Sequence, residues 1–341
     1  MPMNTPGQSP VSAASSLSLT VRREALWVPL LTHFDASGRI DPLRTKQQVA
    51  ALRPSLTGYL LAGSTGAGWK VTDDQFAQLL DLVATSDTFD ERDLVLAGCL
   101  RPTTEEVVAR ARMAESVLGK LAGSATFAGL TVCPPVGATS QAQILDHYRR
   151  VIEATEFPIA VYQLPQVTRC EVDATTMSEL MKTGRIHMFK DTSGEDRVAA
   201  SRVLGDAVWT LRGAEGGYFE ALKPGGAYDG WLLSTANGLA EHYRAIRDMA
   251  TRGDRESAQT LSARVTRAVN AIFELGNQMN LGNVFSNANR AIDHVQAYGA
   301  RCVDVPMPYR IDGSTVPEPY VVQVSAIVRR EGLARARPYL G

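Results

Sequence analysis

The chain lacks the features that mark membrane, nucleic-acid-binding and disulfide-rich proteins. None of its apolar stretches reaches the roughly 20 residues that a membrane helix requires. Its 35 basic and 36 acidic residues give a net charge of −1 without a basic block, which argues against a nucleic-acid partner and favours a small molecule. Cysteine is scarce and forms no C-x-x-C pair; the four lie far apart, at Cys99, Cys133, Cys170 and Cys302. They predict reduced thiols in a cytoplasmic protein, not a zinc site or a disulfide framework.

Histidine is also scarce. A metal-dependent enzyme needs His, Asp or Glu ligands in a cluster. The five histidines are dispersed and show no ligand spacing; they are His33, His147, His187, His242 and His294. We therefore expect no metal, and we interpret these residues as packed or helix-face side chains.

Lysine is rare beside arginine, and one lysine stands in an unusual place. Lys190 closes the short apolar run His187-Met188-Phe189, which predicts a buried strand with the lysine at its carboxyl end. Burial disfavours an ammonium, lowers its pKa and leaves a neutral amine able to attack a carbonyl. This is the chemistry of a Schiff-base lysine, which arginine cannot perform. The alternative is a lysine that reaches to solvent or pairs with Asp191.

Short apolar runs alternate with longer amphipathic segments in eight strand-then-helix units before about residue 253. This rhythm predicts parallel strands with helical crossovers, and eight units predict a closed (β/α)8 barrel, the TIM barrel, of the α/β class. Capping-box spacing supports helix starts at Thr72, Thr103 and Ser140. The expected strands cover residues 25–31, 59–62, 94–99, 129–133, 159–163, 187–190, 209–212 and 229–233.

An open doubly wound sheet is the alternative architecture. It requires a phosphate-binding glycine loop after the first strand. The segment Leu31-Thr32-His33-Phe34-Asp35 has no such pattern, and the glycine-rich segment from Gly63 to Gly68 lacks the lysine of a P-loop.

The chain divides into three parts by composition. Residues 1–20 are rich in Ser, Pro, Ala and Thr without the basic n-region of a signal peptide, so we expect a flexible tail. Residues 21–253 form the expected barrel. Residues 254–341 form an expected helical extension, with helices near 255–278, 284–298 and 321–331. Asn283, Asn287 and Asn289 fall in this extension, where we interpret them as capping and packing groups.

Chemically useful residues stand where the expected strands end. The carboxyl ends of barrel strands meet at one face, so residues from several strands should surround one pocket there. The second strand ends in Gly63-Ser64-Thr65-Gly66, which offers backbone N–H groups and hydroxyls to an anion. The fifth strand carries Tyr162, the sixth ends in Lys190, and the seventh leads to Gly213-Ala214-Glu215. Individually, the segment from Gly63 to Gly66 is more typical of an ordinary strand-to-helix turn, and Tyr162 of a packed core residue with a satisfied hydroxyl.

The glycines after strands seven and eight have another possible use, because barrels often bind phosphate there. Glu215 among them would repel a phosphate. We therefore interpret them as turn formers: Gly213, Gly216, Gly217, Gly225 and Gly226.

Together these residues resemble the dihydrodipicolinate synthase and N-acetylneuraminate lyase superfamily of class I, Schiff-base aldolases. The resemblance covers about residues 25–245. Its members are (β/α)8 barrels with a helical C-terminal region, often tetrameric, that act on pyruvate or another 2-oxo acid. The matching segments follow in order: Thr32-His33-Phe34 with Gly38-Arg39-Ile40-Asp41, Gly63-Ser64-Thr65-Gly66, Tyr162-Gln163-Leu164-Pro165, Phe189-Lys190-Asp191-Thr192-Ser193-Gly194, and Gly230-Trp231-Leu232-Leu233-Ser234-Thr235-Ala236-Asn237.

The resemblance implies a role for each matching residue. Lys190 would form the imine and Tyr162 would act as the acid/base. Ser64 and Thr65, next to Gly63, would bind the substrate carboxylate. Gly230 and Leu232 would help to close the pocket. The covalent imine would make an external cofactor unnecessary, and the partners would be a 2-oxo acid and an aldehyde.

The chain departs from true dihydrodipicolinate synthases at several positions. Val167 stands where those enzymes have a carboxylate-binding arginine, Gln163 replaces an asparagine and Ala67 a glutamate. Their Pro-Tyr-Tyr segment appears as Pro134-Pro135-Val136, so the tyrosine that completes their proton relay is missing. Val136, Val167 and Trp69 suggest an apolar distal pocket, with Glu215 as a further candidate lining residue.

Three functions remain open from the sequence. An aldolase or lyase that breaks or forms a C–C bond through the Lys190 iminium is favoured. A 2-oxo sugar-acid dehydratase would use the same iminium, and Pro134-Pro135 resembles that branch. A non-catalytic 2-oxo acid sensor on an aldolase barrel is the alternative of another class.

Overall fold

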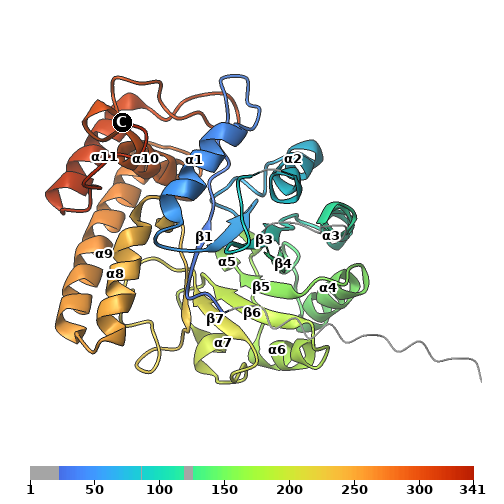
Figure 1. Cartoon of the computed structure of the whole chain (residues 1–341). Coiled ribbons are helices and arrows are strands. Elements are labelled where there is room, and N and C mark those ends of the chain that lie inside the picture. Colours follow the sequence, from blue (N-terminus) through green and yellow to red (C-terminus); the bar gives the residue numbers. More distant parts are fainter. Residues whose placement is uncertain (1–22, 86, 119–125) are drawn as a thin grey trace, which may run out of the picture.

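Eight parallel strands close into a barrel in chain order, with β8 hydrogen-bonded back to β1 (Figure 1). The computed structural model describes residues 23–85, 87–118 and 126–341, so the expected tail over residues 1–20 lies outside the described residues. The strands are β1 (Leu26–Pro29), β2 (Gly58–Leu61), β3 (Leu94–Gly98), β4 (Thr126–Val132), β5 (Ile159–Gln163), β6 (Ile186–Asp191), β7 (Trp209–Arg212) and β8 (Gly230–Leu232). The prediction of a (β/α)8 barrel is confirmed, and the doubly wound sheet is excluded.

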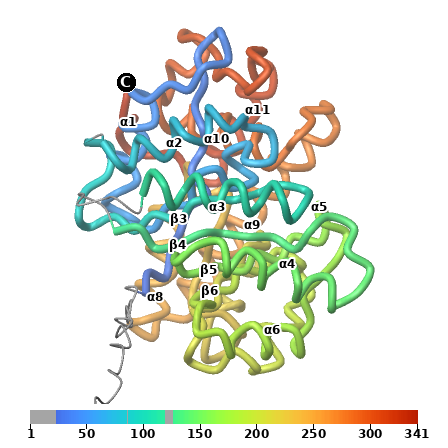
Figure 2. The backbone as a smooth tube through the Cα atoms, turned by 90° about the vertical axis from the view of Figure 1, so that its right-hand side faces the viewer, coloured from blue at the N-terminus to red at the C-terminus, as the bar shows by residue number. Residues whose placement is uncertain are grey.

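Helices follow one another around the outside of the barrel (Figures 1 and 2). Thr72 and Gln75 form the expected capping box, and Thr103 and Glu106 exchange the same pair of bonds. Ser140 accepts from the backbone N–H of Gln143 as expected. The helices of the barrel are α1 (Pro42–Leu52), α2 (Asp73–Ala84), α3 (Thr104–Leu118), α4 (Gln141–Glu153), α5 (Pro165–Thr168), α6 (Ala174–Met181), α7 (Arg197–Ala200) and α8 (Ala236–Thr251).

The expectation of a helix after every strand is wrong at one connection. Residues 213–229, all of them described, join β7 to β8 through turns and bends without a helix. Five glycines and Pro224 stand in this segment, and both residue types disfavour a helix interior. The segment still buries Tyr218 and Phe219, although its backbone is irregular.

The barrel interior is an apolar layer built from alternate strand residues. Ala160 of β5, Met188 of β6 and Leu211 of β7 all belong to it. Successive residues of a strand point to opposite faces, so the residues two positions further along point inward as well. These are Tyr162, Lys190 and Gly213, and the fold therefore places all three above the same layer.

The C-terminal helices pack beside α8 and α1 on one side of the barrel (Figures 1 and 2). They are α9 (Arg255–Gln278), α10 (Val284–Tyr298), the short 3-10 helix η1 (Gly299–Arg301) and α11 (Glu318–Arg330). None of the helices in the described ranges is long and apolar enough to cross a membrane.

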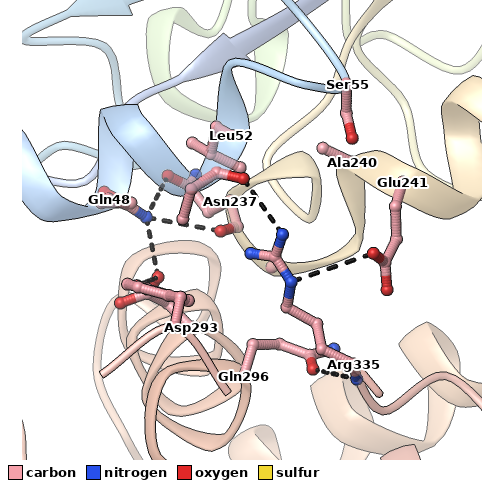
Figure 3. A pocket seen from close by; sticks show the side chains of 12 residues that line it. Gln48, Leu52, Ser55, Asn237, Ala240, Glu241, Asp293, Gln296 and Arg335 are labelled. Atoms are coloured by element: carbon pink, nitrogen blue, oxygen red, sulfur yellow. Dashed lines mark hydrogen bonds and ion pairs between the residues drawn. The ribbon is translucent and has the colours of Figure 1, made fainter. Parts of the chain in front are cut away.

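A buried polar network joins this helical region to the barrel (Figure 3). Gln48 of α1 donates through Nε2 to Asn237 Oδ1 on α8 at 3.2 Å and to Asp293 Oδ1 on α10 at 3.1 Å. Arg335 lies 3.8 Å from the Glu241 carboxylate. These polar groups interact with one another. We therefore interpret the small cavity between them as part of the packing between the barrel and the helical region, and not as a ligand site.

Candidate active site

Lys190 is a buried amine at the carboxyl end of β6. Lys190 is 3% exposed, and its Nζ lies 3.9 Å from the centre of the Tyr162 ring. Burial lowers the pKa of Lys190 to about 7, although the Cys133 thiol and the Glu215 carboxylate act in the opposite direction. A substantial share of the amine is therefore neutral near pH 7, as nucleophilic attack on a carbonyl requires.

The alternative role for Lys190, a pairing with Asp191, does not fit the contacts of that carboxylate. Asp191 accepts from the Ser193 backbone N–H at 2.8 Å and from the Tyr228 hydroxyl at 3.3 Å. Within the described part of the chain, no ion pair joins Lys190 to an acidic residue. Its burial also rules out a side chain that reaches to solvent.

Tyr162 presents a buried phenol beside the lysine. β5 and β6 pair in register, with Tyr162 opposite Lys190. Burial raises the pKa of Tyr162 above its ordinary value, and hydrogen bonding with Ser64 and Thr192 acts in the opposite direction. The phenol is therefore protonated near pH 7 and lies near two further hydroxyls, an arrangement that can pass a proton.

The turn after β2 brings Ser64 and Thr65 to the same end of the barrel. Thr65 is buried, and the Ser64 hydroxyl accepts from Trp69 Nε1 at 3.0 Å. Thr32 closes the turn from β1, because its hydroxyl donates to the Gly66 carbonyl oxygen at 2.7 Å. A Cβ on Gly66 would lie 2.5 Å from the Leu30 carbonyl oxygen, so only glycine fits there. The Ser64 hydroxyl also acts on the Tyr162 phenol, so this cradle adjoins the lysine site.

Gly213 belongs to the site, although the sequence suggested a turn former. A Cβ at this position would lie 2.6 Å from Thr192 Cγ2 and 2.9 Å from Lys190 Cε. The missing side chain thus leaves space for the lysine arm. Its place directly after a strand that ends beside β6 is the sequence signal that could have found it.

Glu215 is held by donors from the end of β8 and its neighbourhood. One carboxylate oxygen accepts from the Ser234 hydroxyl at 2.6 Å, and the other from Thr235 Oγ1 at 2.8 Å and the Tyr218 hydroxyl at 3.0 Å. Its charge acts on Lys190 from this fixed position. Glu215 is thus engaged in the wall of the site, and its carboxylate is not a free group in a distal pocket.

Comparison with known proteins identifies the family. A family model described as the dihydrodipicolinate synthetase family matches residues 23–288. The chain belongs to this family. A 4-hydroxy-tetrahydrodipicolinate synthase of Xanthomonas axonopodis pv. citri is 29% identical over 240 residues, which cover 70% of this chain and 76% of that protein. The low identity agrees with the departures at Val167 and Val136.

Solved structures share the fold at lower identity. KD(P)GA from T. tenax has a TM-score of 0.71 and 22% identity, and covers 90% of this chain and 99% of its own. YagE of E. coli K12, solved in complex with pyruvate, has a TM-score of 0.74 and 18% identity over 91% of this chain and 99% of its own. A 2-keto-3-deoxygluconate aldolase variant of Sulfolobus solfataricus, also with pyruvate, has a TM-score of 0.72 and 16% identity, over 90% of this chain and 96% of its own.

Two of the residues matched to this family lie in the β8 strand. Leu232 is part of the apolar layer inside the barrel, together with Met188 and Leu211. Gly230 lies against Ala25, the residue before β1, because a Cβ at position 230 would lie 2.1 Å from the Ala25 carbonyl oxygen. Its glycine is thus required for strand packing, whatever it contributes to a pocket.

The expected distal residues do not all lie in the same environment. Val136 and Val167 are each 40% exposed, whereas Trp69 packs against the buried cluster around Tyr162. That cluster consists of Leu100, Cys133, Tyr162 and Leu164. The surroundings of the phenol are thus apolar, and the two valines are open to solvent.

The histidines have protein partners. Within the described residues, no three His, Cys, Asp or Glu side chains gather to hold a metal ion. Every one of the five histidines lies within hydrogen-bond distance of a side chain or a carbonyl oxygen: Gln48 for His33, Thr104 and Cys133 for His147, Ile159 for His187, Leu333 for His242 and Cys302 for His294.

Proposed function

We propose that the chain is a class I lyase that acts on pyruvate or a longer 2-oxo acid through an imine on Lys190. The observation that carries the proposal is the buried lysine, whose pKa of about 7 leaves a nucleophilic amine in contact with a protonated phenol. The family relationship and the pyruvate complexes of similar barrels support the same substrate class.

The reaction uses the residues around Lys190 as follows. The neutral amine attacks the C2 carbonyl carbon, and loss of water gives an iminium. Ser64 and Thr65 hold the substrate carboxylate, which fixes C2 beside Nζ. Tyr162 passes protons to and from the substrate oxygen with the help of the Ser64 and Thr192 hydroxyls.

The iminium then acts as an electron sink. Removal of the proton from the C4 hydroxyl breaks the C3–C4 bond, which releases an aldehyde and leaves an enamine on Lys190. Protonation of C3 and addition of water return the 2-oxo acid and the free lysine. The reverse sequence is a condensation. No external cofactor enters either direction.

The surroundings of Tyr162 also bear on the aldehyde partner. The apolar side chains around Tyr162 favour a less charged aldehyde than that used by enzymes with an arginine at the Val167 position. Elimination of water from a sugar acid through the same iminium is the second candidate, favoured by Pro134-Pro135. We also propose a homotetramer in the cytoplasm, on the resemblance alone.

Borohydride trapping tests the mechanism. The protein is incubated with pyruvate, reduced, digested and examined by peptide mass spectrometry. An adduct is expected on Lys190 and none in Lys190→Met, whereas Lys182→Met, which removes an exposed lysine on the outer surface, should leave it unchanged. A folded protein without an adduct would remove the imine mechanism and favour a binding-only protein.

A further inference from the structure

A separate cavity of about 100 Å³ lies between the β2–α2 turn, the start of α10 and the segment around residue 310. Its volume exceeds the space that one water molecule needs. Three cationic side chains and one carboxylate line it, together with polar groups of α10; the side chains used below are Lys70, Arg290, Arg310, Asp312, Ser286 and Asn287. The cavity thus carries an excess of positive charge.

Arg290 is the unusual member of this lining. It is 2% exposed, and its Nε and Nη1 atoms have no hydrogen-bond partner in the described structure. Its guanidinium lies 5.2 Å from the Phe34 ring centre, and burial lowers the pKa of Arg290 to about 10, so it remains charged at neutral pH. The Asp293 carboxylate acts favourably on this charge through space, but Nε and Nη1 have no hydrogen-bond acceptor among the described residues, which is unfavourable for a buried cation.

The nearby carboxylates are already occupied. Asp293, one turn along α10 from Arg290, forms an ion pair with Arg44 and accepts from Gln48 at 3.1 Å. It also accepts from the Tyr339 hydroxyl at 2.5 Å. Asp312 accepts from the backbone N–H of Ser314 at 3.1 Å and from the hydroxyl of the same residue. Neither carboxylate accepts a hydrogen bond from Nε or Nη1 of Arg290.

Two further features favour an anion in the cavity. Arg310 Nε is also buried without a partner, and the charge of Arg310 acts on Arg290. The start of α10 lines the cavity through Ser286 and Asn287, whose backbone N–H groups bond to Asn283, so this helix end contributes the positive end of its macrodipole. Guanidinium groups and a helix start are the groups with which proteins hold phosphate.

We propose that this cavity binds a phosphate group, with Arg290 and Arg310 as its hydrogen-bonding cations and Lys70 at its rim. Three cations and one carboxylate around a cavity of about 100 Å³ suit a dianion better than a singly charged carboxylate. The site is distinct from Lys190, whose chemistry the proposal does not require. It adjoins the cradle, because Asn283 at its edge donates to the Ser64 carbonyl oxygen at 3.5 Å.

The test titrates the full chain with inorganic phosphate by calorimetry and thermal unfolding, against chloride and acetate at equal ionic strength. Phosphate should raise the unfolding temperature with increasing concentration. Acetate should bind at least about tenfold more weakly. Lys70→Gln and Arg310→Gln should each weaken phosphate binding about tenfold, which is the usual effect of one charge-assisted hydrogen bond.

Arg290→Met gives the sharpest readout. Without phosphate it should be as stable as the natural chain or more so, because a buried charge without partners is removed and the contact with Phe34 is kept. With phosphate it should show no gain in unfolding temperature. Should this variant fail to fold, the Lys70 and Arg310 variants at the cavity edge still decide the question.

Two controls separate this cavity from other sites. Lys182→Gln, on an exposed lysine paired with Glu179, should bind phosphate as the natural chain does. Lys190→Met should bind it equally well. Loss of phosphate binding in Lys190→Met would place the anion in the barrel and overturn the proposal. The proposal would also be overturned by unchanged binding in Arg310→Gln and Arg290→Met, by equal binding of acetate, or by the absence of any phosphate effect beyond that of chloride.

Discussion

Replacement of Lys190 by methionine should stabilise the fold at neutral pH while it abolishes imine formation. Burial moves the pKa of this amine from 10.5 to about 7. At about 1.4 kcal/mol for each pH unit, burial of the lysine disfavours folding by about 5 kcal/mol where the unfolded lysine is charged. The variant also loses the contact of the ammonium with the Tyr162 ring. This loss reduces the expected gain in stability by about 1 to 2 kcal/mol. A net gain of about 3 kcal/mol follows.

The gain must depend on pH with a defined sign. Between about pH 7 and pH 10.5 the unfolded chain binds a proton on this lysine that the folded chain does not. The natural chain therefore gains stability relative to the variant as the pH rises through this window. The advantage of Lys190→Met should be largest at and below pH 7 and should vanish near pH 10.5.

Urea unfolding of both proteins at pH 7 and pH 10 measures this difference. Lys182→Met, which alters an exposed lysine, should change the free energy of unfolding by no more than about 0.5 kcal/mol at either pH. Equal stabilisation at both pH values, or destabilisation at pH 7, would refute the view that Lys190 is a desolvated amine.

Three further outcomes follow from the site. The rate of imine formation with pyruvate should rise through an apparent pKa of about 7 and level off above it, as stopped-flow or quench trapping at several pH values would measure; a rate still rising at pH 10 would contradict this. Tyr162→Phe should reduce turnover about 10²- to 10⁴-fold in a steady-state assay, because the proton relay is lost while Lys190 remains; unchanged turnover would remove Tyr162 from the mechanism. Gly213→Ala should prevent borohydride trapping, since its Cβ would lie 2.9 Å from Lys190 Cε, whereas Gly225→Ala, whose Cβ meets nothing closer than 3.9 Å, should trap normally.

The strands could be predicted because each contains a short apolar run. β5 and β7 occupy the expected residues. β4 begins at Thr126, three residues before the expected start. Thr126 is exposed and Phe127 is half-buried, yet they pair with Leu94 and Val95 of β3, so backbone pairing carries the strand beyond its fully buried part.

The connection between β7 and β8 shows where the alternation pattern fails. Tyr218 and Trp231 are buried together, and the Trp231 indole donates to the Tyr218 carbonyl oxygen at 3.1 Å. This contact bridges the segment without a helix. Hydrogen bonds between residues distant in sequence decide such a path, and neither propensity nor periodicity reports them.

Arg290 could not be predicted as a special residue from its position in the chain. The sequence pattern predicts that an arginine within an amphipathic helix faces solvent. It predicts packing roles for the neighbouring Asn287 and Asn289. The structure buries Arg290 because α10 lies against the barrel, with Phe34 beneath the guanidinium. Nε and Nη1 of Arg290 are without partners because the nearby carboxylates bond to other side chains. Those bonds depend on the three-dimensional positions of residues that are far apart in the sequence.

The core of the candidate site was predictable for a reason that lies in strand geometry. Met188 and Lys190 stand two residues apart, as do Ala160 and Tyr162, so the alternation that makes the barrel interior apolar also turns the lysine and the phenol inward. The same alternation turns position 213 inward after Leu211. The absence of a side chain there gives the lysine arm its space. A sequence pattern indicates where side chains gather, whereas the space that a reactive side chain occupies depends on the neighbours that lack one.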